Sequence, residues 1–231
     1  MTPSRAIVAL DLESARDALA LVDRLGDSAS FYKVGLELYT AGGMEIVREL
    51  KARGHRVFLD LKLYDIGETV KRATVQVARV GVDFLTVHGS LAVMQAAVAG
   101  NQSATLRLLA VTVLTSFDES DLTQMGYPCA VSDLVALRVR NAMEAGVHGI
   151  VCSPVEVARV RSLTGPGAIL VTPGVRSAGA AAGDQKRVAT PAEAISNGAD
   201  YLVIGRQVTR ASDPRAEMLK ILEETNAAGS N

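Results

Sequence analysis

The stretch "RVFLDLKLYDIGETVKRATVQVARVGVDFLTVHG", residues 56–89, contains the pattern that decides the fold. An apolar, β-branched run over 56–62 is followed by an amphipathic run over 68–81, which ends in glycine, and then by a second apolar run over 84–89. A short strand, a helix and another strand in this order form a βαβ unit, which joins strands of a parallel sheet. The stretch therefore predicts an α/β fold.

The same alternation continues along the whole chain. Strands are expected over 6–12, 31–37, 56–62, 84–89, 108–114, 149–154, 168–174 and 201–206. Helices are expected over 14–26, 42–54, 68–81, 90–100, 132–146, 156–163, 190–198 and 214–226. Eight such pairs in 231 residues predict a (β/α)8 TIM barrel, as a single domain over residues 1–231. A doubly wound open sheet gives the same alternation and remains an alternative, although no GxGxxG follows the first strand.

Composition and charge favour a small-molecule ligand. The formal net charge is -1, and the Lys and Arg residues are dispersed along the chain, so neither a nucleic acid nor an anionic membrane is indicated as a partner. The N-terminal stretch has one Arg before a short apolar run that Asp11 ends, which fits neither a signal peptide nor a membrane span. We therefore expect a cytoplasmic protein.

The cysteines and histidines do not form a metal or redox motif. Cys129 and Cys152 lack CxxC spacing and a nearby pair of histidines, which is typical of free thiols in a reducing compartment. His55 and His148 precede predicted strands and so fall at the amino ends of the strands. His88 ends the fourth strand without a companion at ligand spacing, so we favour a packing role for it and expect no metal site.

Asp60 and Lys62 interrupt the apolar run that begins at Val57. Because alternate side chains of a strand point to the same face, Phe58, Asp60 and Lys62 share one face, and their apolar neighbours share the other. The apolar face would meet the surrounding helices, which leaves the charged face inside the barrel. Ionised groups there are costly unless they are paired or lie where the barrel opens to a ligand. Their position near the carboxyl end of the strand favours the second explanation.

Other predicted strands also end in polar or charged residues. These are Asp11 after the first strand, Lys33 in the second, Thr115 and Ser116 after the fifth, and Arg206 at the end of the eighth. In a TIM barrel the carboxyl ends of all strands meet on one face, where ligands bind. We therefore expect these side chains to line one site together with Asp60 and Lys62.

Structural explanations exist for the same residues. Helix caps would account for Asp11 and Asp65, a structural ion pair for Lys33, and a turn for the polar residues after the fifth strand. Taken together, however, Lys33, Asp60, Lys62 and Asp65 would form a charge-balanced array of alternating sign. That joint pattern favours an active site.

A phosphate site is indicated at the end of the eighth strand. Gly205 permits close approach of the backbone, and the Arg206 guanidinium matches the geometry of a phosphate. The Gly- and Ala-rich stretch over 176–190 follows the seventh strand, and we expect a mobile loop there on the catalytic face.

Short motifs resemble one known family, the bacterial orotidine 5'-monophosphate decarboxylases. The stretch "DLKLYDI" (60–66) is similar to the family's Asp-x-Lys-x-x-Asp-Ile signature. Further matches are "VALDL" (8–12), "YKVGLEL" (32–38), "AVTVLTS" (110–116), "TPGVR" (172–176), "DQKR" (184–187) and "DYLVIGRQVTRASDP" (200–214). The resemblance implies a cofactor-free decarboxylation of orotidine 5'-phosphate to uridine 5'-phosphate in pyrimidine synthesis, without a metal.

The resemblance also implies catalytic roles for four residues. Lys62 would be the acid that protonates C6 of the pyrimidine after carbon dioxide leaves. Asp60 would lie beside the departing carboxylate, and Lys33 would hold Asp60 and reach the ribose hydroxyls. Asp65 would come from the neighbouring subunit, so the array would be completed across two chains.

Further binding residues are implied in the same way. Ile66 and Thr69 would accompany Asp65 from the neighbouring subunit, which makes a homodimer part of the site. The other expected contacts are Asp11 to the ribose, Thr115 to the pyrimidine edge, and Arg176, Gln185, Gly205 and Arg206 to the phosphate.

Two other functions remain as alternatives. A sugar-phosphate lyase of the same superfamily, similar to 3-keto-L-gulonate 6-phosphate decarboxylase or hexulose phosphate synthase, shares the Asp-x-Lys-x-x-Asp motif but uses Mg²⁺. Lys33 argues against it, because an ammonium at that strand repels a metal cation. A non-catalytic phosphate-binding barrel would retain Gly205 and Arg206 but gives no reason for the charged array.

Overall fold

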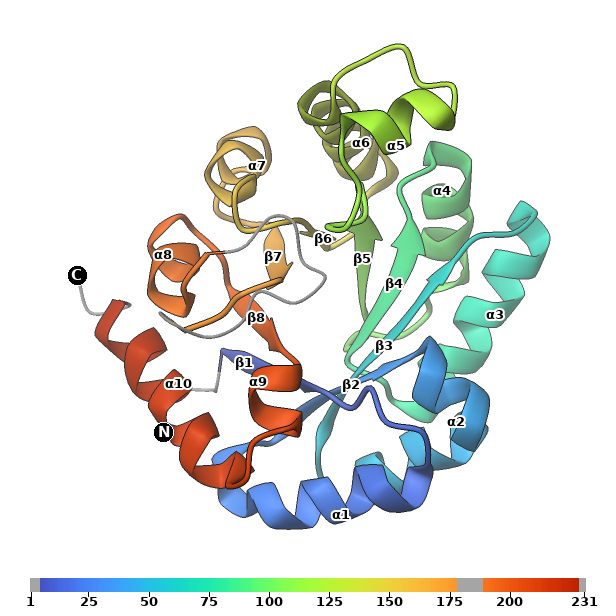
Figure 1. Cartoon of the computed structure of the whole chain (residues 1–231). Coiled ribbons are helices and arrows are strands. Elements are labelled where there is room, and N and C mark those ends of the chain that lie inside the picture. Colours follow the sequence, from blue (N-terminus) through green and yellow to red (C-terminus); the bar gives the residue numbers. More distant parts are fainter. Residues whose placement is uncertain (1–4, 178–188, 229–231) are drawn as a thin grey trace.

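Eight parallel strands form a closed barrel (Figure 1). The computed structural model describes residues 5–177 and 189–228. The strands are β1 (Ala6–Ala9), β2 (Phe31–Gly35), β3 (Arg56–Leu63), β4 (Phe84–His88), β5 (Arg107–Val111), β6 (Gly149–Val151), β7 (Ile169–Pro173) and β8 (Tyr201–Ile204). Each strand pairs with the next, and β1 also pairs with β8, which closes the sheet. The predicted TIM barrel is confirmed, and the open doubly wound sheet is excluded.

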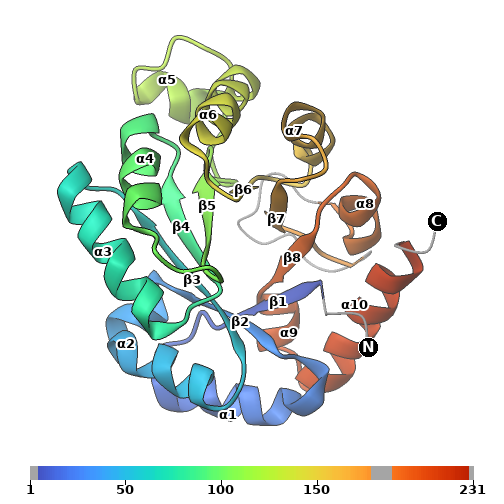
Figure 2. The same ribbon diagram turned by 180° about the vertical axis from the view of Figure 1, so that it is seen from behind.

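Helices surround the strands on all sides (Figure 2). They include α1 (Ala15–Leu25), α2 (Leu36–Ala52), α3 (Gly67–Val80), α4 (Leu91–Gly100), α6 (Val131–Ala145), α7 (Val157–Thr164), α8 (Pro191–Ser196) and α10 (Pro214–Ala228). Helix α2 begins earlier than predicted and bends at Gly43, whose φ of 59° interrupts the helix. In the described part of the chain, no helix combines the length and the apolar character that a membrane crossing requires.

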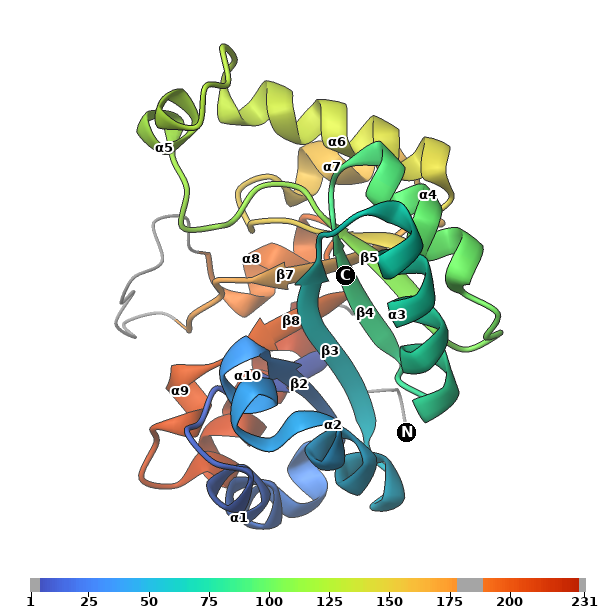
Figure 3. The same ribbon diagram turned by 90° about the vertical axis from the view of Figure 1, so that its right-hand side faces the viewer.

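Three short helical segments are absent from the sequence prediction: the 3₁₀ turn η1 (Gly26–Ser28), α5 (Glu119–Gln124) and α9 (Arg206–Thr209). Each is too short to show helical periodicity. Helix α9 begins where the sequence predicts the end of a strand, because β8 already stops at Ile204. Figure 3 shows α5 and α9 on the same side of the barrel, beyond the carboxyl ends of the strands that precede them.

The barrel interior is filled and closed at its amino end. Alternate strand residues form an inner apolar cluster, which consists of Ile7, Ala9, Phe31, Phe58, Phe84, Leu109, Val171 and Val203. At the amino ends of the strands the Phe31 and Phe84 rings pack edge-to-face on Tyr201. The Arg56 guanidinium lies over the Phe31 ring, 4.0 Å from its centroid. In the part of the chain that the structure describes, a ligand can therefore enter the barrel only from the carboxyl end.

Strand β3 becomes irregular where its charged residues lie. Leu59 pairs with Leu85 and Leu63 with Val87, so four steps along β3 match two along β4. Lys62 has a φ of 50° and is the one non-glycine residue with positive φ in the described ranges. Asp60 and Lys62 both face the interior, as predicted. The prediction relied on regular alternation, whereas the strand contains a bulge between Leu59 and Leu63, where Lys62 lies.

We predict that Gly149→Ala destabilises the barrel. A Cβ at this β6 position would clash with the backbone carbonyl of Ile169 on β7, so the two strands would have to separate. Overpacking of this kind costs about 1–3 kcal/mol of unfolding free energy, measured by urea denaturation. Gly167→Ala is the control, because no atom lies within 4 Å of its new methyl group. Equal stability of the two variants would contradict the prediction.

Candidate active site

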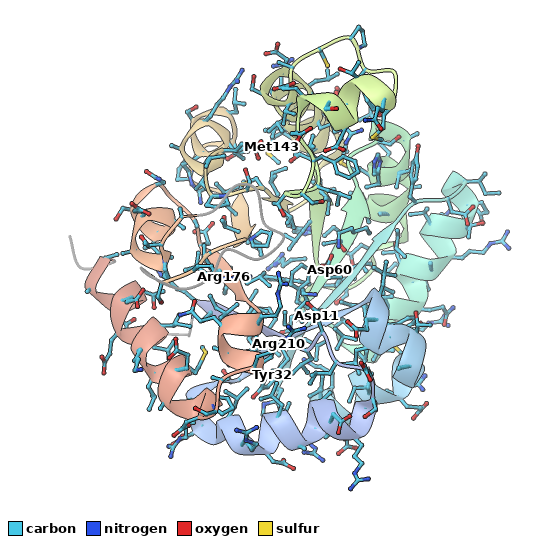
Figure 4. The ribbon with its side chains drawn as sticks, in the orientation of Figure 1. Asp11, Tyr32, Asp60, Met143, Arg176 and Arg210 are labelled. Carbon is cyan, nitrogen blue, oxygen red and sulfur yellow. The ribbon has the colours of Figure 1, made fainter. Side chains whose placement is uncertain are left out.

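A cavity of about 440 Å³ opens at the carboxyl ends of the strands. Most of the predicted site residues line it, namely Asp11, Lys33, Asp60, Lys62, Thr115, Arg176, Gly205 and Arg206. They come from β2 and β3 and from the loops and helix that follow β1, β5, β7 and β8. Figure 4 shows Asp11, Asp60 and Arg176 around the mouth of the barrel. Residues far apart in the sequence thus meet at one site, as the strand-end pattern predicts.

Charges of alternating sign form a chain of ion pairs across the cavity. Lys33 Nζ lies 2.8 Å from Asp11 Oδ1 and 3.8 Å from Asp60 Oδ2. Lys62 Nζ lies 2.9 Å from Asp60 Oδ1. The side chains of Lys33 and Asp60 are only 11% and 14% exposed, so each needs a partner to offset its loss of water.

Glycine at position 35 leaves room for this arrangement. A Cβ on Gly35 would lie 2.8 Å from Lys33 Nζ and 3.1 Å from Asp11 Oδ1. Both distances are shorter than normal van der Waals contacts for a carbon atom, so any side chain here would compete with the ion pair. The last residue of β2 is therefore part of the site, although it has no functional group.

Asp60 is held in its ionised form. Burial alone would raise the pKa of its carboxyl group, but the nearby ammonium groups of Lys33 and Lys62 lower it. Hydrogen bonds from Lys62 and from the Thr86 hydroxyl lower it further, and the net pKa lies below the usual value. Asp60 therefore presents a negative charge to the cavity at neutral pH.

Helix capping does not account for the positions of Asp11 and Asp65. Helix α1 is capped by Ser14, whose side chain accepts a hydrogen bond from the Asp17 backbone, so Asp11 is not a cap. Helix α3 has Ile66 at its N-cap without a side-chain hydrogen bond. Asp65 Oδ1 instead accepts a hydrogen bond of 2.6 Å from the Ile66 N–H.

The polar residues after β5 combine both of their expected roles. The Phe117 N–H donates to the Leu114 carbonyl, 2.9 Å away, which makes Thr115 and Ser116 the central residues of a turn. Both residues also line the cavity. The turn therefore positions their hydroxyl groups at its edge.

Arginines collect on another side of the cavity. Arg176, Arg206 and Arg210 all line it, and Arg210 follows α9 by one residue. Burial and the neighbouring Arg206 both lower the pKa of Arg176, as expected where two cations lie close together. Beside them, no heavy atom lies within 4 Å of the position that a Cβ on Gly205 would occupy. The combination of clustered guanidinium groups and open space suits an anionic group such as a phosphate.

Three predicted residues lie away from this cavity. Asp65, Ile66 and Thr69 are exposed and do not line it, and Ile66 is 74% exposed. The neighbouring Tyr64 is 68% exposed and stacks on His88 with ring centroids 4.2 Å apart. The chain's own cavity is therefore formed without these residues. Gln185 lies outside the described residues.

The histidines lie where the sequence predicts. His55 packs edge-to-face against Tyr32, and His148 Nδ1 accepts a hydrogen bond of 3.0 Å from the Leu108 N–H at the amino end of the barrel. His88 does not line the cavity, and burial and Arg138 lower its pKa. Within residues 5–177 and 189–228, no three His, Cys, Asp or Glu side chains are grouped to hold a metal ion.

Besides Gly35, the sequence prediction omits three residues of the site. Glu37 and Arg210 line the cavity; Arg210 is four positions after Arg206, a spacing that places both on one side of a helix. Thr86 is fully buried and bonds to Asp60. Alternation from Phe84 places Thr86 on the inner face of β4, so the pattern in the sequence contained this information.

Comparisons with known proteins show the family to which the chain belongs. The family model "Orotidine 5'-phosphate decarboxylase / HUMPS family" matches residues 4–221. A protein named orotidine 5'-phosphate decarboxylase from Rhodopseudomonas palustris (strain BisA53) is 55% identical over 220 residues, which cover 95% of this chain and 94% of the relative. A protein of the same name from Methylobacterium nodulans is 52% identical over 233 residues, which cover 98% of this chain and 99% of the relative.

A solved structure shows the same relationship. The crystal structure of orotidine 5'-phosphate decarboxylase from Lactobacillus acidophilus superposes with a TM-score of 0.83 at 34% identity, covering 96% of this chain and 98% of that chain. These matches confirm the resemblance indicated by the motifs, and the chain belongs to the orotidine 5'-phosphate decarboxylase / HUMPS family.

Proposed function

We infer that this chain is an orotidine 5'-phosphate decarboxylase, which converts orotidine 5'-phosphate to uridine 5'-phosphate in pyrimidine biosynthesis without a cofactor. The observation that carries the inference is the Lys33–Asp60–Lys62 array in a cavity whose other side is lined by arginines. Such a cavity offers a cationic acid for the pyrimidine and cations for the phosphate. The family membership of the chain supports the same reaction.

Lys62 is the proposed acid. When the C6 carboxylate leaves as carbon dioxide, the electron pair of the broken bond remains on C6. The Lys62 ammonium stabilises that charge and then transfers a proton to C6, which completes uridine 5'-phosphate and leaves a neutral amine that solvent reprotonates. Asp60, held ionised beside Lys62, directs the Lys62 ammonium, and it would lie next to the departing carboxylate.

The remaining contacts hold the rest of the substrate. We assign Asp11 and Lys33 to the ribose hydroxyls, Thr115 to the pyrimidine edge, and Arg176, Gly205 and Arg206 to the phosphate. All of these residues line the cavity, which supports the assignment. We assign Gln185 to the phosphate by resemblance alone. One well-placed electrostatic donor contributes about 3–4 kcal/mol, whereas the largest enzymatic accelerations need roughly 20 kcal/mol. Binding energy from the phosphate must therefore contribute to catalysis at the pyrimidine.

We further propose a homodimer with shared sites. Asp65, Ile66 and Thr69 are exposed and do not line the chain's own cavity, which suits residues that complete the site of a neighbouring subunit. No nucleic acid or membrane partner is proposed, because the net charge is only -1. A cytoplasmic location remains a prediction from the N-terminal sequence.

A metal-dependent sugar-phosphate lyase is the competing function. Its Mg²⁺ would need oxygen ligands free of other cations. Here the Lys33 ammonium lies between Asp11 and Asp60, the carboxylates that would otherwise be candidates. The donor set therefore does not fit a divalent cation.

The function is tested directly by the loss of absorbance as orotidine 5'-phosphate is consumed. The purified chain should consume this substrate at the same rate with and without excess chelator, because no step uses a metal. No consumption of substrate would refute the proposed function. Turnover of a ketose phosphate that stops with chelator would establish the competing lyase.

We predict that Lys62→Ala lowers kcat by about 10²- to 10⁴-fold, the usual contribution of a positioned general acid. The same absorbance assay measures the loss, and circular dichroism verifies that the variant is folded. Lys220→Ala is the matched control, because that lysine is 69% exposed. A Lys62→Ala variant with nearly full activity would contradict the role of Lys62 as acid.

Mixing two inactive variants tests the shared site. In an equal mixture of Asp65→Asn and Lys62→Ala chains, half of the dimers pair one of each and contain one intact site. About one quarter of wild-type activity should therefore return after subunit exchange. The assay is run before and after exchange, with each variant alone as control. A mixture as inactive as its parents would show that Asp65 does not act across subunits.

A further inference from the structure

Thr86 connects the two central residues of the site without touching the cavity. It lies in the middle of β4, is fully buried, and is not among the residues that line the cavity. Its hydroxyl oxygen is 2.9 Å from Asp60 Oδ1. The same oxygen is 2.9 Å from the backbone nitrogen of Lys62. One hydroxyl group thus bonds to the side chain of Asp60 and to the main chain of Lys62.

The chemistry of these groups fixes the direction of both hydrogen bonds. A backbone N–H can only donate, so the Thr86 oxygen accepts from Lys62 and has its single proton free for another partner. That proton is donated to Asp60 Oδ1, which must therefore act as an acceptor. Asp60 Oδ1 also accepts from Lys62 Nζ at 2.9 Å. The same carboxylate oxygen therefore accepts hydrogen bonds from both Lys62 and Thr86.

The bond to the Lys62 backbone falls at the bulge in β3. Regular pairing with β4 is interrupted between Leu59 and Leu63, so Lys62 has no register partner on β4. Lys62 also has a φ of 50°, a conformation that costs an L-residue roughly 1–2 kcal/mol. The Thr86 hydroxyl satisfies the N–H in this conformation, which keeps the bulge in place.

We propose that Thr86 is a positioning residue for the reaction: its hydroxyl group links the orientation of the Asp60 carboxylate to the backbone conformation that directs Lys62 into the cavity. The catalytic consequence rests on the proposed function, because it assumes that Lys62 is the acid. The geometric part, a hydroxyl that holds an ionised Asp60, stands independently of turnover.

The surroundings of Asp60 determine how the link can be measured. Its charged neighbours are Lys33 from β2 and Lys62 from β3 itself, while β4 contributes the Thr86 hydroxyl and Asp11 is paired with Lys33. Removing the hydroxyl leaves both ammonium groups but deletes one stabilising bond to the carboxylate. The Asp60 pKa should then rise, and activity that needs ionised Asp60 should decline at a higher pH than in the wild type.

The test compares Thr86→Val with Thr86→Ser. Valine keeps the shape of the side chain and removes the hydroxyl group, whereas serine keeps the hydroxyl and removes the methyl group. We expect Thr86→Val to lower kcat by about 10- to 100-fold, the usual effect of losing a hydrogen bond to a charged group, with KM almost unchanged. The acid limb of its pH–rate profile should move up by about one unit. Thr86→Ser should keep kcat and the position of the acid limb close to those of the wild type.

Thr172→Val provides the matched control. Thr172 is likewise a fully buried threonine in a central strand, and its hydroxyl oxygen has no hydrogen-bond partner in the described structure. Its neighbour Val171 belongs to the inner cluster, so Thr172 faces the helices. The same chemical change there should leave kcat and the pH profile unaltered.

A second measurement separates failure of this inference from failure of the proposed function. Carbon-13 NMR of the Asp60 carboxyl group, assigned by its loss in Asp60→Asn, should show a higher titration midpoint in Thr86→Val than in the wild type. If the midpoint shifts but the chain has no decarboxylase activity, the role of Thr86 in holding Asp60 is supported and only the proposed function is refuted. The inference would be overturned if the wild type is active and Thr86→Val has the same kcat, the same acid limb of the pH–rate profile and the same Asp60 titration midpoint.

Discussion

The buried negative charge of Asp60 is the constraint on which the mouth of the barrel depends. An isolated carboxylate that is only 14% exposed would be strongly destabilised by its loss of water. Lys33 and Lys62 offset that cost, and Lys33 in turn pairs with Asp11. The charges thus depend on one another, because the loss of Asp11 or Lys62 leaves Lys33 or Asp60 with one counter-charge fewer. Such interdependence holds the groups in fixed positions before a ligand arrives.

The distribution of charge also divides the cavity into two parts. Beside β2 and β3 the cations and anions alternate and nearly cancel, whereas the arginines after β7 and β8 add positive charge without an equal number of acids among the lining residues. A ligand with a single strongly anionic end is therefore oriented as it enters. Thr115 and Ser116 also line the cavity, and their hydroxyl groups can form directional hydrogen bonds without adding net charge.

Local sequence patterns predicted most of this architecture but missed features that depend on contacts between strands. Alternation along "RVFLDLK" placed Asp60 and Lys62 on the inner face, and the order of strands brought Lys33 and Arg206 to the same mouth. The bulge at Lys62 arises from pairing with β4, which cannot be recognised within β3 alone. The role of Thr86 is similar, since a threonine in a strand is unremarkable until Asp60 lies opposite it. Individual roles such as those of Asp65 and Gln185 came only from the family resemblance.

The aromatic layer at the amino end determines how substrate enters and how products leave. The interior below the cavity is filled by Phe31, Phe84 and Tyr201, and Arg56 packs over the Phe31 ring. In the part of the barrel that the structure describes, the cavity is therefore open only at the carboxyl end. The incoming nucleotide, the released gas and the finished product must all pass through that single opening. Any group that covers the mouth therefore controls entry, escape and solvent access at the same time, so one closing movement can regulate all three.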